Sequence, residues 1–200
     1  HRPDTHAWAA DRLWELARAA APGSDAQLQL TRAAAGRSTS TEHLDAVAGL
    51  LDGSAPLPGL VVDTDLRWDL LQALVAGGRA GTEEIEAELA RDATASGERR
   101  AAAARAAVPT PEAKAAAWRA VVTEDALTNA LQTSTIAGFA DVHDLSLLVP
   151  YVEPYFAALE QVWAERTNEM AQNIVVGLYP TLLAGHPGVD VLARTDAWLA

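Results

Sequence analysis

Residues 63–78 constrain the fold most, because they carry a complete helix with a start signal and a stop signal. Asp63 or Thr64 can accept a hydrogen bond from a free backbone N–H at the helix start, and Gly77 follows the last apolar residue. Apolar residues recur between them at helical spacing over an arc wider than a surface helix needs. We therefore predict a helix that is packed on more than one side.

Arg67 falls inside this apolar arc. A guanidinium group cannot lose its charge in a protein, so it needs a carboxylate or several carbonyl oxygens as partners when it is buried. Two interpretations remain open for Arg67. It can form a structural ion pair inside the helix stack, or it can be an inward-facing contact for an anion.

A second helix is expected to open at Thr82, after the glycine-rich turn. It has only a thin apolar strip, Ile85 and Leu89, and we expect its glutamates, at 83, 84, 86 and 88, to face solvent. A buried helix, a tight turn and a solvent-facing helix form an αα-hairpin. We expect the rest of the chain to repeat this unit.

Further helix signals support an all-α class. Thr110 followed by Pro111 predicts a helix start, Thr123 predicts another, and Gly138 predicts the end of the helix that begins at Thr123. A pair of helices occupies roughly 30–45 residues, as in HEAT or armadillo repeats. Half of the residues are hydrophobic, many of them alanine, the best helix former. We predict irregular stacked helical hairpins that form a HEAT/armadillo-like superhelix.

The charge distribution is uneven, with a formal net charge of −12. This balance argues against nucleic acid as a partner, because phosphate binding uses clustered Lys and Arg. Residues 91–119 alone are basic, with 6 bases and 3 acids, and they include Arg99, Arg100 and Arg105. The basic band is either an anion-facing strip or a solvated helix face. No apolar window reaches the ~20 residues of a membrane span, so we expect no membrane partner either.

No catalytic or metal site is predicted within the chain. The histidines are never four residues apart, and none is followed by Glu, so a His-Glu-x-x-His zinc site is absent; they stand at 1, 6, 43, 143 and 186. Ser134, His143 and Asp144 supply the residue types of a hydrolytic triad, but no strained Gly-x-Ser-x-Gly turn presents the serine. We interpret them as a helix-end hydroxyl and a surface histidine.

Four segments, taken in their order and spacing, resemble a known family. They are 57–60 (Leu-Pro-Gly-Leu), 65–78, 148–156 (Leu-Val-Pro-Tyr-Val-Glu-Pro-Tyr-Phe) and 172–180 (Gln-Asn-Ile-Val-Val-Gly-Leu-Tyr-Pro). The sequence resembles the C-terminal, HEAT-like helical domain of bacterial aminopeptidase N. That domain belongs to the zinc aminopeptidases, which include the endoplasmic-reticulum aminopeptidases, and the likeness is to their actinobacterial branch. The resemblance covers essentially all of the chain.

The resemblance implies that residues 1–200 are a single C-terminal domain without its first helices, a fragment of a larger multidomain enzyme. The domain would cover the active site and control peptide access, with the catalytic domain of the same chain and the peptide substrate as partners. Zinc would sit in that catalytic domain and none in this fragment, which alone would be inactive. The family also implies a cytoplasmic location. Arg67, Arg99, Arg100 and Arg105 are the candidates for peptide contact or structural ion pairs.

Two other functions fit the helical pattern. The first is a free-standing helical-repeat scaffold that binds a protein on its concave face. The second is a helical regulator or small-molecule binder, for which only the tryptophans and the acidic charge speak.

Overall fold

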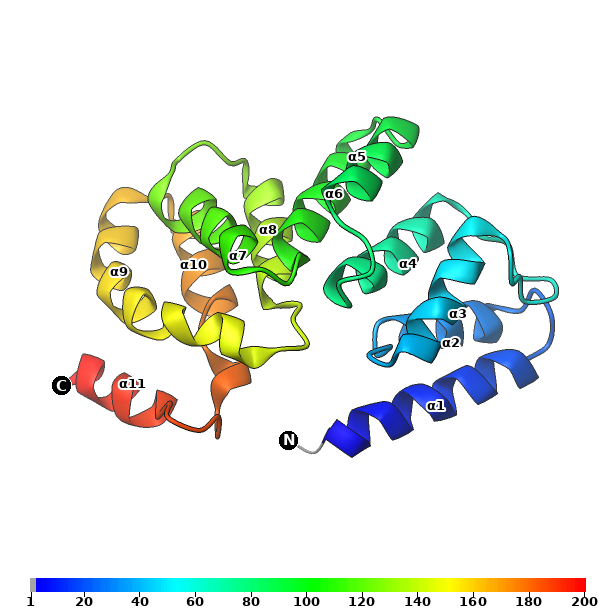
Figure 1. Cartoon of the computed structure of the whole chain (residues 1–200). Helices are drawn as coiled ribbons and strands as arrows, with labels where there is room; N and C mark the ends of the chain where they lie inside the picture. Colours follow the sequence, from blue (N-terminus) through cyan, green and yellow to red (C-terminus); the bar gives the residue numbers. More distant parts are fainter. Residues whose placement is uncertain (1–2) are drawn as a thin grey trace. The chain divides into compact units, whose positions relative to one another are not determined.

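The structure is a computed structural model that describes residues 3–200, with side chains from residue 7 onward. The described residues form α-helices joined by short turns, with no β-strand among them (Figure 1). The predicted all-α class is therefore confirmed. By their internal contacts the residues divide into two compact units, His1–Asp92 and Ala93–Ala200, and each is described by itself.

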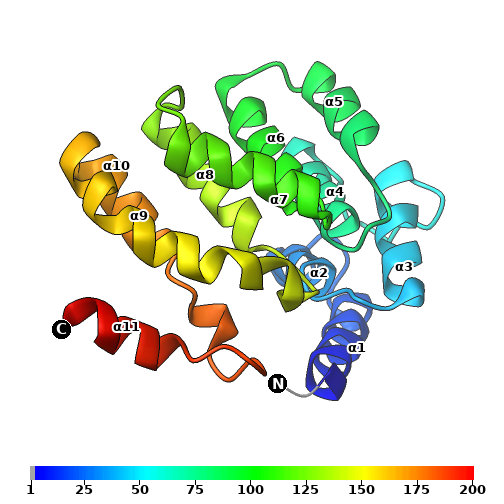
Figure 2. The ribbon, with the colours of Figure 1, turned by 60° about the vertical axis from the view of Figure 1, so that its left-hand side comes forward.

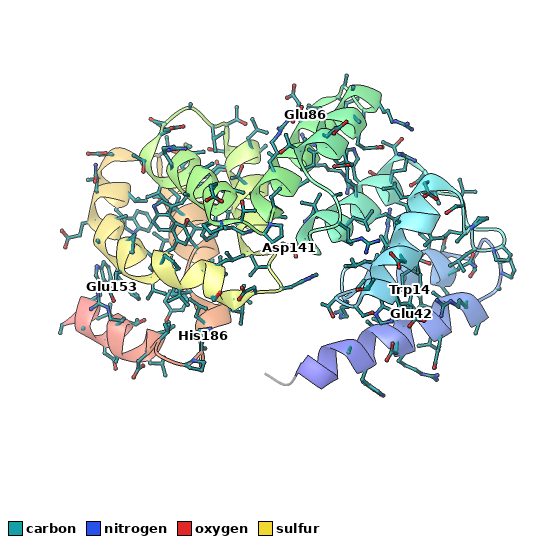
Figure 3. All side chains as sticks on the ribbon, viewed as in Figure 1. Trp14, Glu42, Glu86, Asp141, Glu153 and His186 are labelled. Atoms are coloured by element: carbon teal, nitrogen blue, oxygen red, sulfur yellow. The ribbon has the colours of Figure 1, made fainter. Side chains whose placement is uncertain are left out.

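The first unit contains five helices. They are α1 (Pro3–Ala19), α2 (Asp25–Ala35), α3 (Thr41–Asp52), α4 (Thr64–Ala76) and α5 (Thr82–Arg91). Helix α1 packs on α2 and helix α3 packs on α4, and Figure 2 shows α1 and α2 from a second side. Trp14, labelled in Figure 3, is buried, and its indole Nε1 donates to the Ser38 hydroxyl at 3.1 Å. The sequence predicts stacked helical hairpins, and in this unit helices adjacent along the chain do pack on each other, α4 on α5 included.

The second unit contains the remaining elements. They are α6 (Ala95–Ala107), α7 (Pro111–Trp118), the π-helical turn η1 (Arg119–Thr123), α8 (Asn129–Ala140), the 3-10 helix η2 (Leu145–Tyr151), α9 (Val152–Glu165), α10 (Asn168–Gly177), the 3-10 turn η3 (Thr181–Leu183) and α11 (Val191–Leu199). Helix α8 packs against both α6 and α10. Tyr155, Phe156 and Leu159 of α9 are buried in the core of this unit. An aromatic group of Trp118, Phe139 and Tyr151 extends that core.

Local start signals place several helices where the sequence predicts them. The Asp63 carboxylate accepts a hydrogen bond from Leu66 N at 2.9 Å and begins α4. The Thr110 hydroxyl accepts one from Ala113 N at 3.2 Å and begins α7, with Pro111 as its first residue. Each cap satisfies an N–H group that the helix itself leaves free. The predicted starts at Asp63 and Thr110 are confirmed.

The predicted helix start at Thr123 is wrong. Residues 119–123 continue α7 as a π-helical turn, and α8 begins after Thr128, whose hydroxyl caps it. The reason is tertiary. Arg166, at the end of α9, donates to the carbonyl oxygens of Val122 and Glu124 and pairs with the Asp125 carboxylate. These contacts hold the segment that follows Thr123 in an irregular connection, residues 124–128, instead of a first helical turn.

The predicted helix end at Gly138 is wrong. Gly138 lies inside α8, which continues to Ala140. A Cβ atom at this position would lie 1.9 Å from the backbone oxygen of Ala103 in α6. The glycine therefore allows the backbones of α6 and α8 to approach closely. Its role is packing between helices.

Candidate functional site

Arg67 of α4 is held by two parallel hydrogen bonds to Glu88 of α5. Its Nε donates to Glu88 Oε1 at 2.7 Å and its Nη2 donates to Oε2 at 2.6 Å. Its Nη1 donates to the Leu51 carbonyl oxygen at 3.2 Å. The Glu88 carboxylate raises the pKa of Arg67 through these hydrogen bonds, against the effect of burial. This fork-to-carboxylate geometry is among the strongest polar contacts in proteins.

The burial of Glu88 differs from the sequence interpretation. We expected the glutamates of α5 to face solvent, but Glu88 is only 5% exposed, whereas Glu83, Glu84 and Glu86 are exposed. A carboxylate is buried here because the guanidinium group of Arg67 compensates its charge. The ion pair therefore ties α5 to α4.

The three candidate arginines of the basic band lie on α6, where Arg99 and Arg105 are exposed and Arg100 is half-buried. At 3.6 residues per turn their side chains leave the helix in directions at least about 100° apart, so they do not form one stripe. Arg105 borders an open groove of about 230 Å³ that is otherwise lined by Thr135 and alanines of α6, α7 and η1.

Lys114 of α7 is a cation that sequence reasoning did not single out. It is fully buried, and its ammonium group donates to three backbone carbonyl oxygens, at 2.6 Å to Ala106, 3.2 Å to Gly138 and 3.1 Å to Phe139. Burial lowers the pKa of Lys114 to about 8, although the Asp141 carboxylate acts in the opposite direction. One signal was available, since Lys114 is the only lysine of the chain and lies in an alanine-rich helix.

The side chains from residue 7 onward do not form a zinc site. Within residues 7–200 no three His, Cys, Asp or Glu side chains come close enough to share a metal ion. The His43 ring contacts the Asp11 carboxylate at 2.8 Å, and the His186 ring contacts the Pro187 carbonyl oxygen at 3.0 Å. His1 and the side chain of His6 lie outside the described residues.

The serine, histidine and aspartate that could form a hydrolytic triad lie in a helix and in the connection after it. Ser134 is in the middle of α8 and not at a helix end, as the sequence interpretation had it, because α8 continues past it to Ala140. His143 and Asp144 are exposed in the connection that follows, so the surface position of the histidine is confirmed. The Asp144 carboxylate accepts the Ser146 backbone N–H at 2.9 Å and caps η2, and hydrogen bonds from the side chain and then the backbone of Ser146 lower its pKa. The observed role of Asp144 is thus to cap η2.

No helix in the described part of the chain is both long enough and apolar enough to cross a bilayer.

Comparison with known proteins identifies the class of this all-α chain. A family model described as the ERAP1-like C-terminal domain matches residues 6–200. The chain therefore belongs to the family of ERAP1-like C-terminal domains.

The chain is similar to aminopeptidase N of Streptomyces lividans, with 54% identity over 183 residues. The match covers 92% of this chain and 21% of that protein, so the chain spans about a fifth of the relative's length. The resemblance to the C-terminal domain of aminopeptidase N, drawn from four sequence segments, is confirmed.

Proposed function

We propose that this chain is the C-terminal cap of a zinc-dependent aminopeptidase, which covers the active site and controls the access of peptides. The observation that carries the proposal is the family match over residues 6–200, together with a relative named aminopeptidase N that is more than four times as long as this chain. In such an enzyme, the catalytic domain of the same polypeptide and the peptide are the partners of this domain. Residues 1–200 then act as a single domain in the cytoplasm.

The reaction itself belongs to the rest of the enzyme. In such an enzyme, zinc held by the catalytic domain would supply the activation of water for cleavage of the first peptide bond. The described side chains of this chain offer no metal-binding group, which supports a role in access and positioning. Covering an active site excludes bulk water and restricts which substrates reach the metal.

A contact between α6 and the peptide is part of the proposal. Arg105 borders an open groove lined by small side chains, and Arg99 is exposed on the same helix. A guanidinium group at such a place can pair with a carboxylate of a bound peptide. In this proposal Arg67 has a structural role, because its guanidinium group already pairs with the Glu88 carboxylate.

The cap role is tested in the full-length enzyme by comparing it with a version that ends before this chain. Hydrolysis of a single-residue anilide reports the catalytic centre, and hydrolysis of peptides of increasing length reports access. We expect the dependence of kcat/KM on peptide length to change when the domain is removed. An unchanged length dependence in an active truncated enzyme would reject the cap role and favour an independent binding scaffold.

The truncated enzyme can fail to fold, so a second design keeps the domain in place. Pairs of cysteines that join this domain to the catalytic domain would be oxidised to stop relative motion, with the reduced protein as the matched control. We expect oxidation to slow hydrolysis of long peptides more than hydrolysis of the anilide. Equal effects on both substrates would contradict control of access.

A further inference from the structure

Lys114 is the only lysine among 200 residues, whereas the other cationic side chains are 14 arginines. It is also the only lysine or arginine in the described chain whose side chain is fully buried. A lysine shifts its pKa readily when it is buried, whereas an arginine stays charged. The chain therefore places its one titratable amine in the interior of the second unit.

The ammonium group of Lys114 lies where two helices end. Ala106 is the second-to-last residue of α6, and Gly138 and Phe139 are in the last turn of α8. The last four carbonyl groups of a helix have no partner within that helix, and the helix dipole places partial negative charge there. The three N–H donors of the Lys114 ammonium group thus match three carbonyl oxygens of α6 and α8, while the backbone of Lys114 belongs to α7.

Few charged groups surround this amine. Helix α8 carries no ionisable side chain, and η2 contributes the phenol of Tyr151, whose ring contacts Phe139. Asp141, just after α8, is the carboxylate whose charge acts on Lys114, and it is labelled in Figure 3. Exposed Glu112 and Arg119 belong to α7 and its continuation. The charged residues of α6 are Glu98, Arg99, Arg100 and Arg105.

We propose that Lys114 is a proton-linked latch, that is, a group that couples the packing of α6, α7 and α8 to proton binding. The packed helices enclose this single amine among carbonyl groups, and at alkaline pH the amine takes up a proton when the helices separate. The inference rests on geometry within the second unit and is independent of the proposed enzymatic role. Separation returns the amine to water, where a charged ammonium group is favoured again.

The sign of the effect follows from the two protonation states. Below pH 8 the amine is charged both in the packed and in the separated state, so the equilibrium does not depend on pH through this group. Between the lowered pKa of about 8 and the ordinary value of 10.5, the separated state binds one more proton than the packed state. Raising the pH in this window therefore suppresses separation, by up to tenfold per pH unit.

The first test uses the wild-type chain. Because it contains one lysine, isotope labelling of lysine gives a single side-chain signal, which is followed by NMR from pH 6 to pH 11. We expect a titration midpoint near 8. A midpoint at 10.5 or above would overturn the latch, since the folded state would then hold the proton at least as well as water does.

The second test measures urea unfolding of the wild type and of Lys114→Met between pH 7 and pH 10. Methionine is of similar length and cannot titrate, and Lys114→Arg serves as a control whose charge is permanent. We expect the unfolding constant of the wild type, relative to either variant, to fall by tenfold or more from pH 8 to pH 10. Parallel curves would reject the proposal. If neither variant folds, the wild-type titration decides.

Discussion

A Cβ atom on Gly138 would overlap the backbone oxygen of Ala103 at 1.9 Å, so α6 and α8 cross at a point where only glycine fits. Helix propensity alone favours alanine over glycine inside a helix by about 1 kcal/mol. The crossing reverses this preference, because the obstacle is backbone and cannot rotate away. Two helices of the second unit thus depend on one missing methyl group.

We accordingly expect Gly138→Ala to lower the free energy of unfolding by about 1–3 kcal/mol or more, the usual range for overpacking. Urea unfolding followed by circular dichroism measures the change. Gly36→Ala is the matched control, since its Cβ would meet its nearest neighbour at an ordinary 3.6 Å. If both substitutions have the same small effect, the close crossing of α6 and α8 is wrong.

The Arg67–Glu88 pair gives a second prediction. Removing one partner leaves the other charge buried and uncompensated, so Glu88→Gln should cost about 3 kcal/mol of stability. The exposed pair Arg79–Asp45 is the control, and Asp45→Asn should change stability by about 1 kcal/mol or less.

The Arg67–Glu88 coupling is measured with a double-mutant cycle. Arg67→Met combined with Glu88→Met should be less destabilising than the sum of the two single substitutions. Each single variant leaves one buried charge without its partner, whereas the double variant leaves none. Strict additivity would mean that the two side chains do not depend on each other.

We expect Tyr155 to lower the stability of the fold at high pH. This pH dependence is opposite in sign to that expected from Lys114. Burial raises its pKa to about 12 from 10.0, and its hydroxyl donates to the Val175 carbonyl oxygen at 2.7 Å. Between pH 10 and 12 the folded state keeps the phenol proton and the unfolded state loses it. Stability should therefore fall by up to about 1.4 kcal/mol per pH unit relative to Tyr155→Phe.

Denaturation at several alkaline pH values, combined with tyrosinate absorbance, tests this prediction. The Tyr155 phenol should ionise near pH 12. Stability curves of the wild type and Tyr155→Phe that stay parallel above pH 10 would contradict the raised pKa.

The 200-residue chain alone gives a fourth prediction, on metal and activity. It should retain no stoichiometric zinc after gel filtration from a zinc-containing buffer, and it should not hydrolyse an aminoacyl-anilide. Elemental analysis and an absorbance assay measure the two properties. Robust hydrolysis by a metal-free preparation would overturn the assignment of the reaction to another domain.

Helix α6, with its exposed arginines, gives a fifth prediction, which is tested in the full-length enzyme. Arg99→Glu combined with Arg105→Glu should change kcat/KM for long acidic peptides several-fold more than for a single-residue anilide, because only long substrates would reach α6. Arg37→Glu is the control, since it reverses an exposed charge in the first unit. Equal effects of the two reversals on all substrates would reject peptide contact at α6.

Local signals predicted the fold well where the responsible contact lies within one turn of helix. Asp63 and Thr110 cap their helices through backbone N–H groups three residues ahead, so sequence spacing alone identifies them. Thr123 carried the same kind of signal, but Arg166, more than forty residues away, takes the carbonyl oxygens of that segment. A long-range contact therefore decided where α8 begins.

The candidate site was only partly readable for the same reason. The position of Arg67 in an apolar arc indicated the need for an anionic partner, but not that the partner is Glu88, 21 residues further on. Lys114 gave no periodic signal, because its role comes from the ends of two other helices. Ion pairs and carbonyl cradles form between elements, and their partners have no fixed spacing in the sequence.

The sequence by itself determined the all-α class, the family and most helix starts, since these depend on residue spacing and on composition. Only the tertiary structure decided the burial of Glu88, the enclosure of Lys114 and the need for glycine at 138. Each of these depends on how close two helices lie, and that distance follows from side-chain packing across the whole unit.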